Sequence, residues 1–400
     1  MKIAVLTSGI LPVPAVRGGA VENLVDFYLD YNDRHRLHNI TVYSIADPAA
    51  RRHRALRSEV NHYRFIDVGS PIAKLRKRLM HWLLRHEEYY HYTIEYYLRQ
   101  AISDIRRRQF DTIVIENRPG YALRLREVTD ARLVYHLHNE KLDISSDSGR
   151  TIYDAATRIL TVSDYIRSRV MTINPADTKT VTIHNGIDLS RFAPATRVDG
   201  TSPTARQGRE ALGLSSDDFV LVFSGRVNSE KGIMELVEAM SRLQHISGLR
   251  LLVIGSSFYD TTAGDDEFTA RLKAKAAPLA DRILFTGFVP YSRMPDYLAM
   301  ADVAVVPSVW DDPFPTTVLE AQAMGLPVIA TRRGGIPEEV TDDGALLIDT
   351  GEGFVQRLAD AISLLYSDAG RREAMGRASR ANAARFDKDR YARDFFNALQ

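Results

Sequence analysis

Short apolar runs rich in β-branched residues alternate along most of the chain with segments of helical periodicity. Runs such as 2–6, 219–225 and 301–306 have the length of buried strands. Apolar residues recur every three or four positions in segments such as 21–29 and 233–243, which is typical of helices with one buried face. This alternation predicts parallel sheets covered by helices. Further strands are expected at 40–45, 63–68, 111–115, 132–137, 158–162, from 181 onwards, 251–255, 283–285 and 328–330.

The alternation falls into two repeats, separated by a segment rich in Pro, Thr, Ser and Arg. Such a composition indicates a linker, and a chain of 400 residues suits two domains. We therefore expect a first domain at 1–190, a linker at 191–207, a second domain at 208–382 and a C-terminal helical segment at 383–400. The predicted fold class is α/β, with two doubly wound, Rossmann-like domains.

The segment 71–108 combines an apolar stripe at helical spacing with a concentration of basic residues at its start. A basic amphipathic helix that contains Trp82 could lie on anionic lipid. The alternative is a helix packed on the core whose other face is solvated, and both interpretations remain open. The stripe includes Leu75, Leu79, Trp82, Leu83, Tyr90, Ile94, Tyr97 and Leu98, and the basic residues are Lys74, Arg76, Lys77, Arg78 and Arg85.

Composition changes this picture through charge and through the residues that are missing. The chain has no cysteine, which excludes disulfides, thiolate catalysis and cysteine-ligated metal sites. No apolar run reaches the ~18 residues of a membrane span, and the first one is too short for a signal peptide. We therefore expect a cytoplasmic protein, or one that is peripheral on the inner face of a membrane.

Charge is distributed unevenly. Residues 1–195 carry 29 Lys and Arg against 22 Asp and Glu, a net charge of +7, whereas the remainder carries 23 against 29, a net charge of −6. The basic half could meet an anionic surface or partner, although solvated Arg-rich helices would give the same count. No nucleic-acid partner is expected.

Two carboxylates and a helix start follow the predicted strand 301–306. The loop that contains Asp312 leads into a helix from Thr316, and Glu320 lies in its first turns. Ligands bind at the carboxyl ends of strands in such sheets. The free N–H groups of Thr316 and Thr317 would favour an anion there, while the carboxylates suit a hydroxyl-rich group. This predicts a phosphate ester with a polyol part, the alternative being a solvated loop and an ordinary first-turn Glu.

Glycines and cations follow two other predicted strands. Arg226 and Lys231 flank the turn after 219–225, where a guanidinium and an ammonium would suit a diphosphate. Gly18 and Gly19 precede a helix start, so backbone N–H groups could approach a phosphate. Solvated loop cations and a plain strand-to-helix turn are the respective alternatives.

Polar clusters also follow the predicted strands 111–115 and 132–137. His136 and His138 point to the same side of their strand, since side chains alternate. The pair could chelate a metal, but no third ligand is suggested by the sequence, and none is predicted to bind. The polar residues at these strand ends are Glu116, Asn117, Arg118, His138, Asn139 and Glu140.

The spacing of Asp312 and Glu320, followed by Gly334-Gly335-Ile-Pro-Glu338, resembles glycosyltransferase family 4. These are retaining nucleotide-sugar enzymes of the GT-B fold, in which two Rossmann-like domains face each other across a cleft. The element Asn185-Gly-Ile-Asp188 is similar to the family's interdomain segment. The resemblance implies that the segment 383–400 crosses back to the first domain.

The resemblance also implies roles for residues. Arg226 and Lys231 would hold the leaving nucleoside diphosphate, Glu320 the ribose and Asp312 the sugar hydroxyls, while His138 would touch the sugar from the other domain. The implied catalytic residues are His138, Asp312, Arg226 and Lys231. The implied donor-binding residues are Gly18, Gly19, Gly225, Arg226, Lys231, Gly287, Phe288, Asp312, Thr316, Thr317 and Glu320, and the acceptor side would comprise Glu116, Asn117, Arg118, Asn139 and Glu140.

Two departures from the family pattern affect the pocket of the donor sugar. Asp312 stands where most relatives have Glu, which is one methylene longer. Pro315 occupies a position often held by Gly and has no N–H to donate. The sugar contacts of this chain could therefore differ from those of its relatives.

The predicted activity is transfer of a sugar, with retention of configuration, from a nucleoside diphosphate sugar to an acceptor hydroxyl. A UDP-sugar is favoured as donor, and a glycan or lipid-linked acceptor is expected, in the synthesis of cell-surface polysaccharide or glycolipid. No cofactor and no metal are expected. The alternatives are a GT-B-like epimerase or phosphorylase, and a non-catalytic sugar-nucleotide-binding or coat-associated protein.

Overall fold

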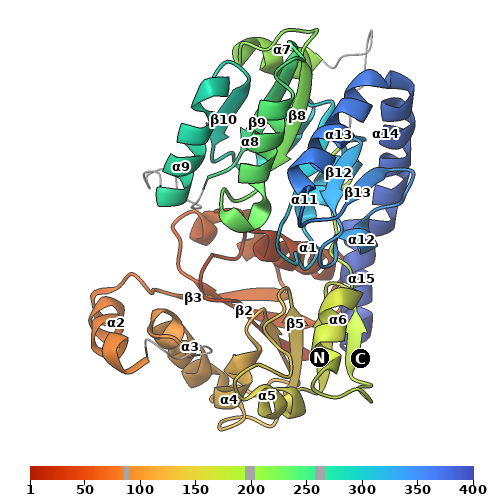
Figure 1. Cartoon of the computed structure of the whole chain (residues 1–400). Helices are drawn as coiled ribbons and strands as arrows, with labels where there is room; N and C mark the ends of the chain where they lie inside the picture. Colours follow the sequence, from red (N-terminus) through yellow and green to blue (C-terminus); the bar gives the residue numbers. More distant parts are fainter. Residues whose placement is uncertain (85–89, 194–202, 257–265) are drawn as a thin grey trace. The chain divides into compact units, whose positions relative to one another are not determined.

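The computed structural model describes residues 1–84, 90–193, 203–256 and 266–400 (Figure 1). These residues form two compact units. Unit 1 comprises Met1–Gly186 together with Lys388–Gln400, and unit 2 comprises Ile187–Asp387. Each unit is built on one sheet of parallel strands.

Unit 1 contains a seven-stranded sheet in the order β3-β2-β1-β4-β5-β6-β7. Ile3 of the central strand β1 lies opposite Ile40 on one side and Thr112 on the other. Ile3 and Val5 pack against α1 and α15, and the residues between them face the opposite way because side chains alternate along a strand. The strands are β1 (Lys2–Leu6), β2 (Asn39–Ile45), β3 (Asn61–Ile66), β4 (Thr112–Glu116), β5 (Arg132–Leu137), β6 (Arg158–Thr161) and β7 (Thr180–Thr182).

The C-terminal helix α15 belongs to unit 1 and packs against α1. Tyr28 of α1 stacks on Phe395 of α15 with ring centroids 4.1 Å apart. Arg34 donates a hydrogen bond of 3.0 Å to Asp389. The helices of unit 1 are α1 (Ala20–His35), α2 (Pro71–Leu84), α3 (Tyr92–Ile105), α4 (Ala122–Leu125), α5 (Gly149–Ala155), α6 (Asp164–Met171) and α15 (Lys388–Ala398).

Unit 2 contains a six-stranded sheet in the order β10-β9-β8-β11-β12-β13. Its core joins alternate residues of the strands, such as Leu221 and Val305, to α8, α9 and α13. The strands are β8 (Phe219–Ser224), β9 (Leu249–Ile254), β10 (Ile283–Gly287), β11 (Val303–Val306), β12 (Val328–Thr331) and β13 (Ala345–Ile348). The helices are α7 (Pro203–Ala211), α8 (Ile233–Arg242), α9 (Glu267–Ala276), α10 (Met294–Leu298), α11 (Thr316–Ala323), α12 (Ile336–Glu339), α13 (Phe354–Ser367) and α14 (Ala369–Ala383).

The segment expected to be a linker is partly folded into unit 2. Phe192 of this segment is completely buried, and the chain is helical again from Pro203. Proline suits the first turn of a helix, where its missing N–H costs nothing, so the Pro-rich composition misled the prediction at 203–207. Residues 194–202 of the expected linker lie outside the described residues.

The expected boundary at 383 is displaced to Asp387. A 3-10 turn at Ala384–Phe386 and extended backbone at Asp387 separate α14 from α15, so the helix of the C-terminal segment begins only at Lys388. Ile187 donates a backbone hydrogen bond of 2.7 Å to Phe386. Both ends of unit 2 are therefore held together.

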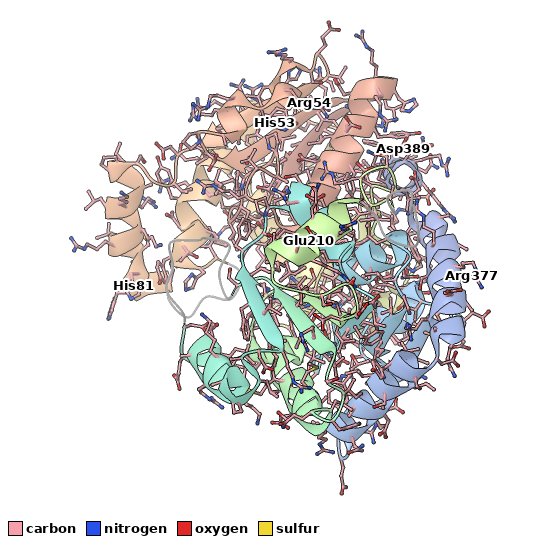
Figure 2. All side chains as sticks on the ribbon, turned by 90° about the horizontal axis from the view of Figure 1, so that it is seen from above. His53, Arg54, His81, Glu210, Arg377 and Asp389 are labelled. Atoms are coloured by element: carbon pink, nitrogen blue, oxygen red, sulfur yellow. The ribbon has the colours of Figure 1, made fainter. Side chains whose placement is uncertain are left out.

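The segment predicted as one amphipathic stretch at 71–108 forms two helices with different surroundings. In α3, Ile94, Tyr97 and Leu98 are buried, so the core-packed interpretation is correct there. In α2 only Ala73 is buried, and that interpretation is wrong. Figure 2, in which His81 of α2 is labelled, shows the side chains of this helix projecting away from its ribbon. Arg85 lies outside the described residues.

Candidate active site

The loops that follow β8 and β11 bring a lysine and a carboxylate together in unit 2. Lys231, in the 3-10 turn Ser229–Lys231, forms an ion pair with Asp312 in the loop after β11. The two side chains are 18% and 6% exposed. Ser308 donates a long hydrogen bond of 3.4 Å to the same carboxylate, and the Lys231 ammonium lies 5.7 Å from the centre of the Trp310 ring. The negative charge of the buried Asp312 carboxylate is thus compensated by the Lys231 ammonium.

A glycine allows this close approach of the two loops. Gly232 has φ +68°, and a Cβ there would lie 1.8 Å from the carbonyl oxygen of Pro307. The N–H of Val309 donates to the carbonyl of Glu230 at 2.9 Å. Only glycine fits between these backbones, so the position of Lys231 is set by backbone packing.

Arg226 differs from Lys231 in its surroundings. Its side chain is 47% exposed, and its contact with Glu230 is long, at 3.8 Å. Gly225 before it has φ +146°, at the carboxyl end of β8. Arg226 is therefore accessible to a ligand, whereas Lys231 is already paired.

Helix α11 begins beside this pair without a side-chain cap. Pro315 occupies the N-cap position, where no side-chain hydrogen bond is made. Thr316 and Thr317 follow in the first turn, where backbone N–H groups have no partner inside the helix. Glu320 is 4% exposed, and burial raises its pKa to about 8, although a hydrogen bond with Thr316 opposes the shift. Glu320 is therefore largely protonated at neutral pH without a ligand.

The Gly-Gly element supports the Asp312 loop through the backbone. Gly334 has φ +54°, and a Cβ there would lie 2.2 Å from the carbonyl oxygen of Asp312. The N–H of Gly335 donates to the same carbonyl at 2.8 Å. Gly334 is therefore needed to place Asp312.

Gly287 and Phe288, which the resemblance implies as donor-binding residues, lie at the same edge of the sheet. Strand β10 ends at Gly287, which has φ +71°, and the carbonyl of Gly287 accepts a hydrogen bond of 3.0 Å from Gly255 at the end of β9. Phe288 next to it is half-buried. The carboxyl ends of β10, β9, β8 and β11 thus gather Gly287, Gly225, Arg226 and Asp312 along one edge.

In unit 1 the carboxyl ends of β4 and β5 carry a buried polar cluster. Glu116 and His136 are completely buried, and the His138 side chain is 6% exposed. A carboxylate oxygen of Glu116 lies 3.0 Å from Nδ1 of His136 and 3.2 Å from Nε2 of His138. Tyr28 donates a hydrogen bond of 2.9 Å to the other oxygen.

Sequence reasoning found no third ligand beside the two histidines, and this was wrong. Glu116 contributes one, since the nearest ligand atoms of Glu116, His136 and His138 lie within 4.8 Å of one another. The distances of 3.0 and 3.2 Å are those of hydrogen bonds. The prediction that no metal binds stays a prediction.

The remaining polar residues of unit 1 lie around this cluster. Asn117 has φ +60°, and its side-chain oxygen accepts hydrogen bonds from the backbone of His138 at 3.2 Å and from the Asn139 amide at 2.7 Å. Arg118 and Glu140 are half-buried in the adjoining loops. The two strand ends are therefore cross-linked through Asn117.

Gly18 and Gly19 precede α1 with φ of +77° and +98°. A Cβ at Gly19 would lie 2.2 Å from a carboxylate oxygen of Glu22. Gly19 thus makes room for Glu22, which is 6% exposed. This local reason for glycine exists besides the predicted contact with a phosphate.

Two family models match the chain. One, described as "Glycosyl transferases group 1", matches residues 205–382, and the other, described as "Glycosyltransferase Family 4", matches residues 34–191. The chain belongs to glycosyltransferase family 4.

The relatives of this chain include one protein named as a spore coat protein and others named as glycosyltransferases. Spore coat protein SA of Bacillus subtilis is 29% identical over 394 residues, which cover 96% of this chain and 94% of that protein. A D-inositol 3-phosphate glycosyltransferase of Xylanimonas cellulosilytica is 36% identical over 210 residues, which cover 52% of this chain and 48% of that protein.

Solved structures establish the fold of the glycosyltransferase as GT-B. Anabaena HepE, solved with UDP and glucose, is 22% identical with a TM-score of 0.75, covering 100% of this chain and 99% of that chain. A glycosyltransferase of Rickettsia africae is 20% identical with a TM-score of 0.76, covering 100% of this chain and 98% of that one.

Sequence reasoning missed two buried acids of the glycosyltransferase. Burial raises the pKa of Glu22 to about 7, with Glu116 and Asp26 adding to the shift and hydrogen bonds opposing it. Glu339 is completely buried, and neither of its carboxylate oxygens has a partner among the described residues. Burial, together with the negative charge of Asp312, raises its pKa well above the usual range. In the sequence Glu339 is one of two adjacent acids in a short helix, which gives no sign of burial.

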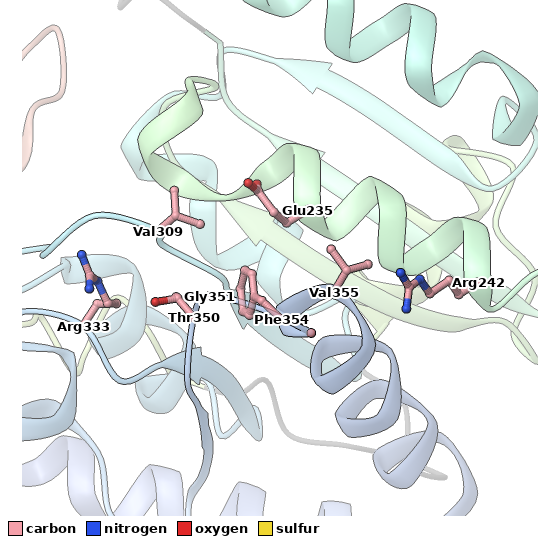
Figure 3. A pocket seen from close by; sticks show the side chains of 9 residues that line it. Glu235, Arg242, Val309, Arg333, Thr350, Gly351, Phe354 and Val355 are labelled. Carbon is pink, nitrogen blue, oxygen red and sulfur yellow. The ribbon is translucent and has the colours of Figure 1, made fainter.

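A pocket of about 420 Å³ lies near the Asp312 loop (Figure 3). Glu235 and Arg242 of α8 line it together with Val309, Arg333 and the start of α13. Arg333 also forms an ion pair of 3.1 Å with Asp311. None of the four residues predicted to be catalytic lines this pocket.

Proposed function

We propose that the protein is a retaining, metal-independent glycosyltransferase that transfers a sugar from a nucleoside diphosphate sugar to an acceptor hydroxyl. A UDP-sugar is the favoured donor, and a glycan or lipid-linked acceptor in cell-surface polysaccharide or glycolipid synthesis is the favoured context. The observation that carries the proposal is the accessible Arg226 beside the Lys231–Asp312 pair and the uncapped start of α11. The UDP complex of the similar Anabaena protein supports the choice of donor.

The charges of unit 2 suit a leaving diphosphate. The bond from the anomeric carbon to the phosphate oxygen breaks, and negative charge builds on the diphosphate as it leaves. Arg226 would bind it bidentately, and Lys231 and the N–H groups of Thr316 and Thr317 would add donors, so that the charge is stabilised electrostatically. Asp312 would then be free to accept hydrogen bonds from sugar hydroxyls.

Retention follows if the acceptor oxygen attacks from the face that the diphosphate leaves. The acceptor proton then passes to the departing phosphate oxygen, so that no side chain has to act as nucleophile or base. Glu320 would accept hydrogen bonds from the ribose hydroxyls. Its raised pKa means that donor binding at neutral pH should release a proton from this carboxyl.

Donor hydrolysis in the presence of a metal chelator tests the reaction. The protein should release the nucleoside diphosphate from one class of sugar nucleotide, and the free sugar should initially have the anomeric configuration of the donor. Arg226→Ala should lose this activity, whereas Arg377→Ala, which removes an exposed guanidinium of α14, should keep it (Figure 2). Inverted product, or a requirement for added metal, would contradict the proposed mechanism.

A second candidate function is sugar-nucleotide binding without turnover. It is favoured by the likeness to spore coat protein SA over nearly the whole chain, and by Asp312 and Pro315, which depart from the family pattern in the sugar pocket. Saturable nucleotide binding with no release of diphosphate from any donor would support this candidate over the transferase.

We also propose that α2 rests on an anionic membrane surface. Ile72, Leu75, Leu79, Trp82 and Leu83 are 62–75% exposed, which is unusual for large apolar side chains on one helix. Lys74, Lys77 and Arg78 are exposed on the same helix. Arg76, by contrast, forms hydrogen bonds of 2.7–3.0 Å with the buried Glu95 of α3, so it attaches α2 to the unit. In the described part of the chain no helix is long and apolar enough to cross a membrane.

Flotation with vesicles of anionic phospholipid tests the role of α2. The triple variant Lys74/Lys77/Arg78→Ala and the variant Leu79/Trp82→Ser should both float less than wild type. A control, Arg52/Arg54/Arg57→Ala, removes three exposed charges from the two 3-10 turns before β3, which carry no apolar face. Equal flotation of all four proteins would refute the membrane role.

A further inference from the structure

The sheet of unit 1 turns polar side chains outward at the amino ends of its first strands. Ile3 and Ile40 belong to the core that the sheet forms with α1 and α15. Side chains alternate along a strand, so Lys2, Asn39 and Thr41 face the opposite way. Their face of the sheet is the one on which α3 lies.

Helix α3 is attached to this face towards the carboxyl end of β2. Tyr97 of α3 donates a hydrogen bond of 2.7 Å to the carbonyl of Tyr43, and the Tyr43 hydroxyl donates one of 3.0 Å to Asp104. The helix ends at Ile105, and the ring of Phe110 in the next loop packs edge-on against Tyr43 at 6.4 Å. The amino ends of the strands lie beyond these contacts.

A pocket of about 750 Å³ lies at these amino ends, within the ~300–1,000 Å³ that small-molecule sites occupy. Lys2, Asn39 and Asn61, the first residues of β1, β2 and β3, line it. We call it the amino-edge basin. Because the strands are parallel, the polar cluster of Glu116 and His138 lies at the other edge of the sheet. Strand β1 alone has five residues, which span about 16 Å at ~3.3 Å each, so the basin is a separate site.

Three cations line the amino-edge basin, and the described residues of its lining include no acid. They are Lys2, Arg64 and Arg108. Asp104 lies 2.9 Å from Arg108 and 3.9 Å from Arg64, so it orients both guanidiniums and compensates one charge. Asp111 accepts a hydrogen bond of 2.7 Å from the backbone N–H of Lys2, whereas the Lys2 ammonium has no partner among the described residues. An anionic group is therefore favoured in the basin.

Neutral polar side chains line the same basin. Thr41 is 6% exposed, and its hydroxyl has no hydrogen-bond partner among the described residues. The side-chain amides of Asn39 and Gln109 are equally unpartnered in the described part of the chain. Buried polar groups are normally hydrogen-bonded, and hydroxyls and amides both donate and accept. They suit a ligand that carries hydroxyls, and the half-buried ring of Phe110 adds an apolar surface.

We propose that the amino-edge basin is a second binding site, for an anionic saccharide. Lys2, Arg64 and Arg108 bind its carboxylate or phosphate groups, while Asn39, Thr41 and Gln109 exchange hydrogen bonds with its hydroxyls. Two sources share this chemistry, a free sugar phosphate and a charged segment of a glycan. The site binds without transferring a sugar, so the inference goes beyond the proposed function and does not depend on turnover.

Calorimetric titration of the intact protein at low ionic strength tests the charges. A hexamer of galacturonic acid represents the glycan, glucose 6-phosphate the free sugar phosphate, and maltohexaose is the neutral control. At least one anionic sugar should bind saturably and maltohexaose should not. Each exposed cation should be worth about threefold in Kd, so Lys2/Arg64/Arg108→Gln should bind about thirtyfold more weakly.

A matched variant separates the basin from net charge. Arg150/Arg206/Arg377→Gln removes the same charge from side chains that are 66–77% exposed elsewhere, and it should bind as wild type does. If the basin triple variant does not fold, Lys2→Gln alone should still bind about threefold more weakly, because this ammonium has no partner to lose. No saturable binding of either anionic sugar, or equal weakening in the two triple variants, would overturn the proposal.

Thr41→Val tests whether the ligand is a saccharide, because it removes the hydroxyl and keeps the branched shape. Binding of the anionic sugar should weaken about fivefold, the effect of one neutral hydrogen bond, whereas weak binding of inorganic phosphate to the cations should not change. Inorganic phosphate that binds as tightly as the sugars, with no effect of Thr41→Val on either, would reveal a plain anion site and overturn the assignment. A preference for the hexamer or for glucose 6-phosphate would support the proposal and identify the source.

Discussion

Lys231→Ala should destabilise unit 2 strongly, although one interpretation of the sequence made Lys231 a solvated loop cation. Its side chain is 18% exposed and pairs with Asp312, which is 6% exposed. Removal of one partner from a buried ion pair costs about 3–5 kcal/mol, because the other charge stays buried. Since Lys231 keeps some contact with solvent, we expect a loss of about 3 kcal/mol. The negative charge left on Asp312 would also lie near buried Glu339.

Arg226→Ala is the matched control for this variant. The Arg226 side chain is 47% exposed and has only a 3.8 Å contact with Glu230, so the free energy of unfolding should change by less than about 0.5 kcal/mol. Both variants should lose nucleotide binding under the proposed function. Loss of activity in Lys231→Ala would therefore combine lower stability with a lost ligand contact, whereas loss of activity in Arg226→Ala would report the lost ligand contact alone.

The protein contains two tryptophans, Trp82 in unit 1 and Trp310 in unit 2, so tryptophan fluorescence can be made specific for unit 2. In a Trp82→Phe background, Trp310 fluorescence follows unit 2 alone during unfolding in urea. The double variant Lys231→Ala/Asp312→Ala should be less destabilised than the sum of its single variants, by about 2 kcal/mol. Additive effects, or a Lys231→Ala protein as stable as Arg226→Ala, would refute the inference that the pair is buried and coupled.

The other predictions concern acids and glycines. The pKa of Glu320 is raised from 4.5 to about 8. A raised pKa in the folded state contributes stability that is present below pH ~4.5 and is lost as the pH rises through 8, so the free energy of unfolding should fall over this window. In urea titrations at several pH values, Glu320→Gln should show a smaller fall than wild type. Glu339→Gln should change stability little at pH 6 and raise it at alkaline pH, and an equal effect at both pH values would contradict the protonated state of this carboxyl. Gly232→Ala should lower the free energy of unfolding several times more than Gly213→Ala. Both glycines have φ near +70°, but only at Gly232 would a Cβ meet a backbone oxygen, at 1.8 Å. Gly213→Ala should lower the free energy of unfolding by about 1 kcal/mol, and equal Tm values of the two variants would refute the steric argument.

Strands that form a continuous apolar run could be predicted from the sequence, whereas the short, partly buried strand β13 could not. Strand β11 is a continuous apolar run, as strands covered on both faces are. Strand β13 was missed because Leu346, Leu347 and Ile348 are only partly buried and the strand has four residues. Hydrophobic periodicity also could not separate α2 from α3, since it reports which residues share a face and not whether anything covers that face.

The motifs indicated which residues lie at the carboxyl ends of the strands, but not how they pair. Lys231 and Asp312 are 81 positions apart, and only the close approach at Gly232 brings them together. The burial of Glu116 beneath His136 and His138 likewise depends on the register of β4 and β5, in which Glu116 lies opposite His136. Contacts of this kind follow from tertiary packing, which local sequence patterns do not contain.

The central claim is that the edge of unit 2 around Arg226 binds a nucleoside diphosphate sugar. Thermal unfolding with UDP-, GDP-, ADP- and dTDP-sugars in the presence of a metal chelator tests it most directly, because a ligand at about 100 times its Kd adds ~2.7 kcal/mol of stability. The account predicts that one class of sugar nucleotide, most simply the UDP-sugars, raises the Tm of wild type and Arg377→Ala but not that of Arg226→Ala. An unchanged Tm with every sugar nucleotide, or an equal rise in Arg226→Ala, would contradict it.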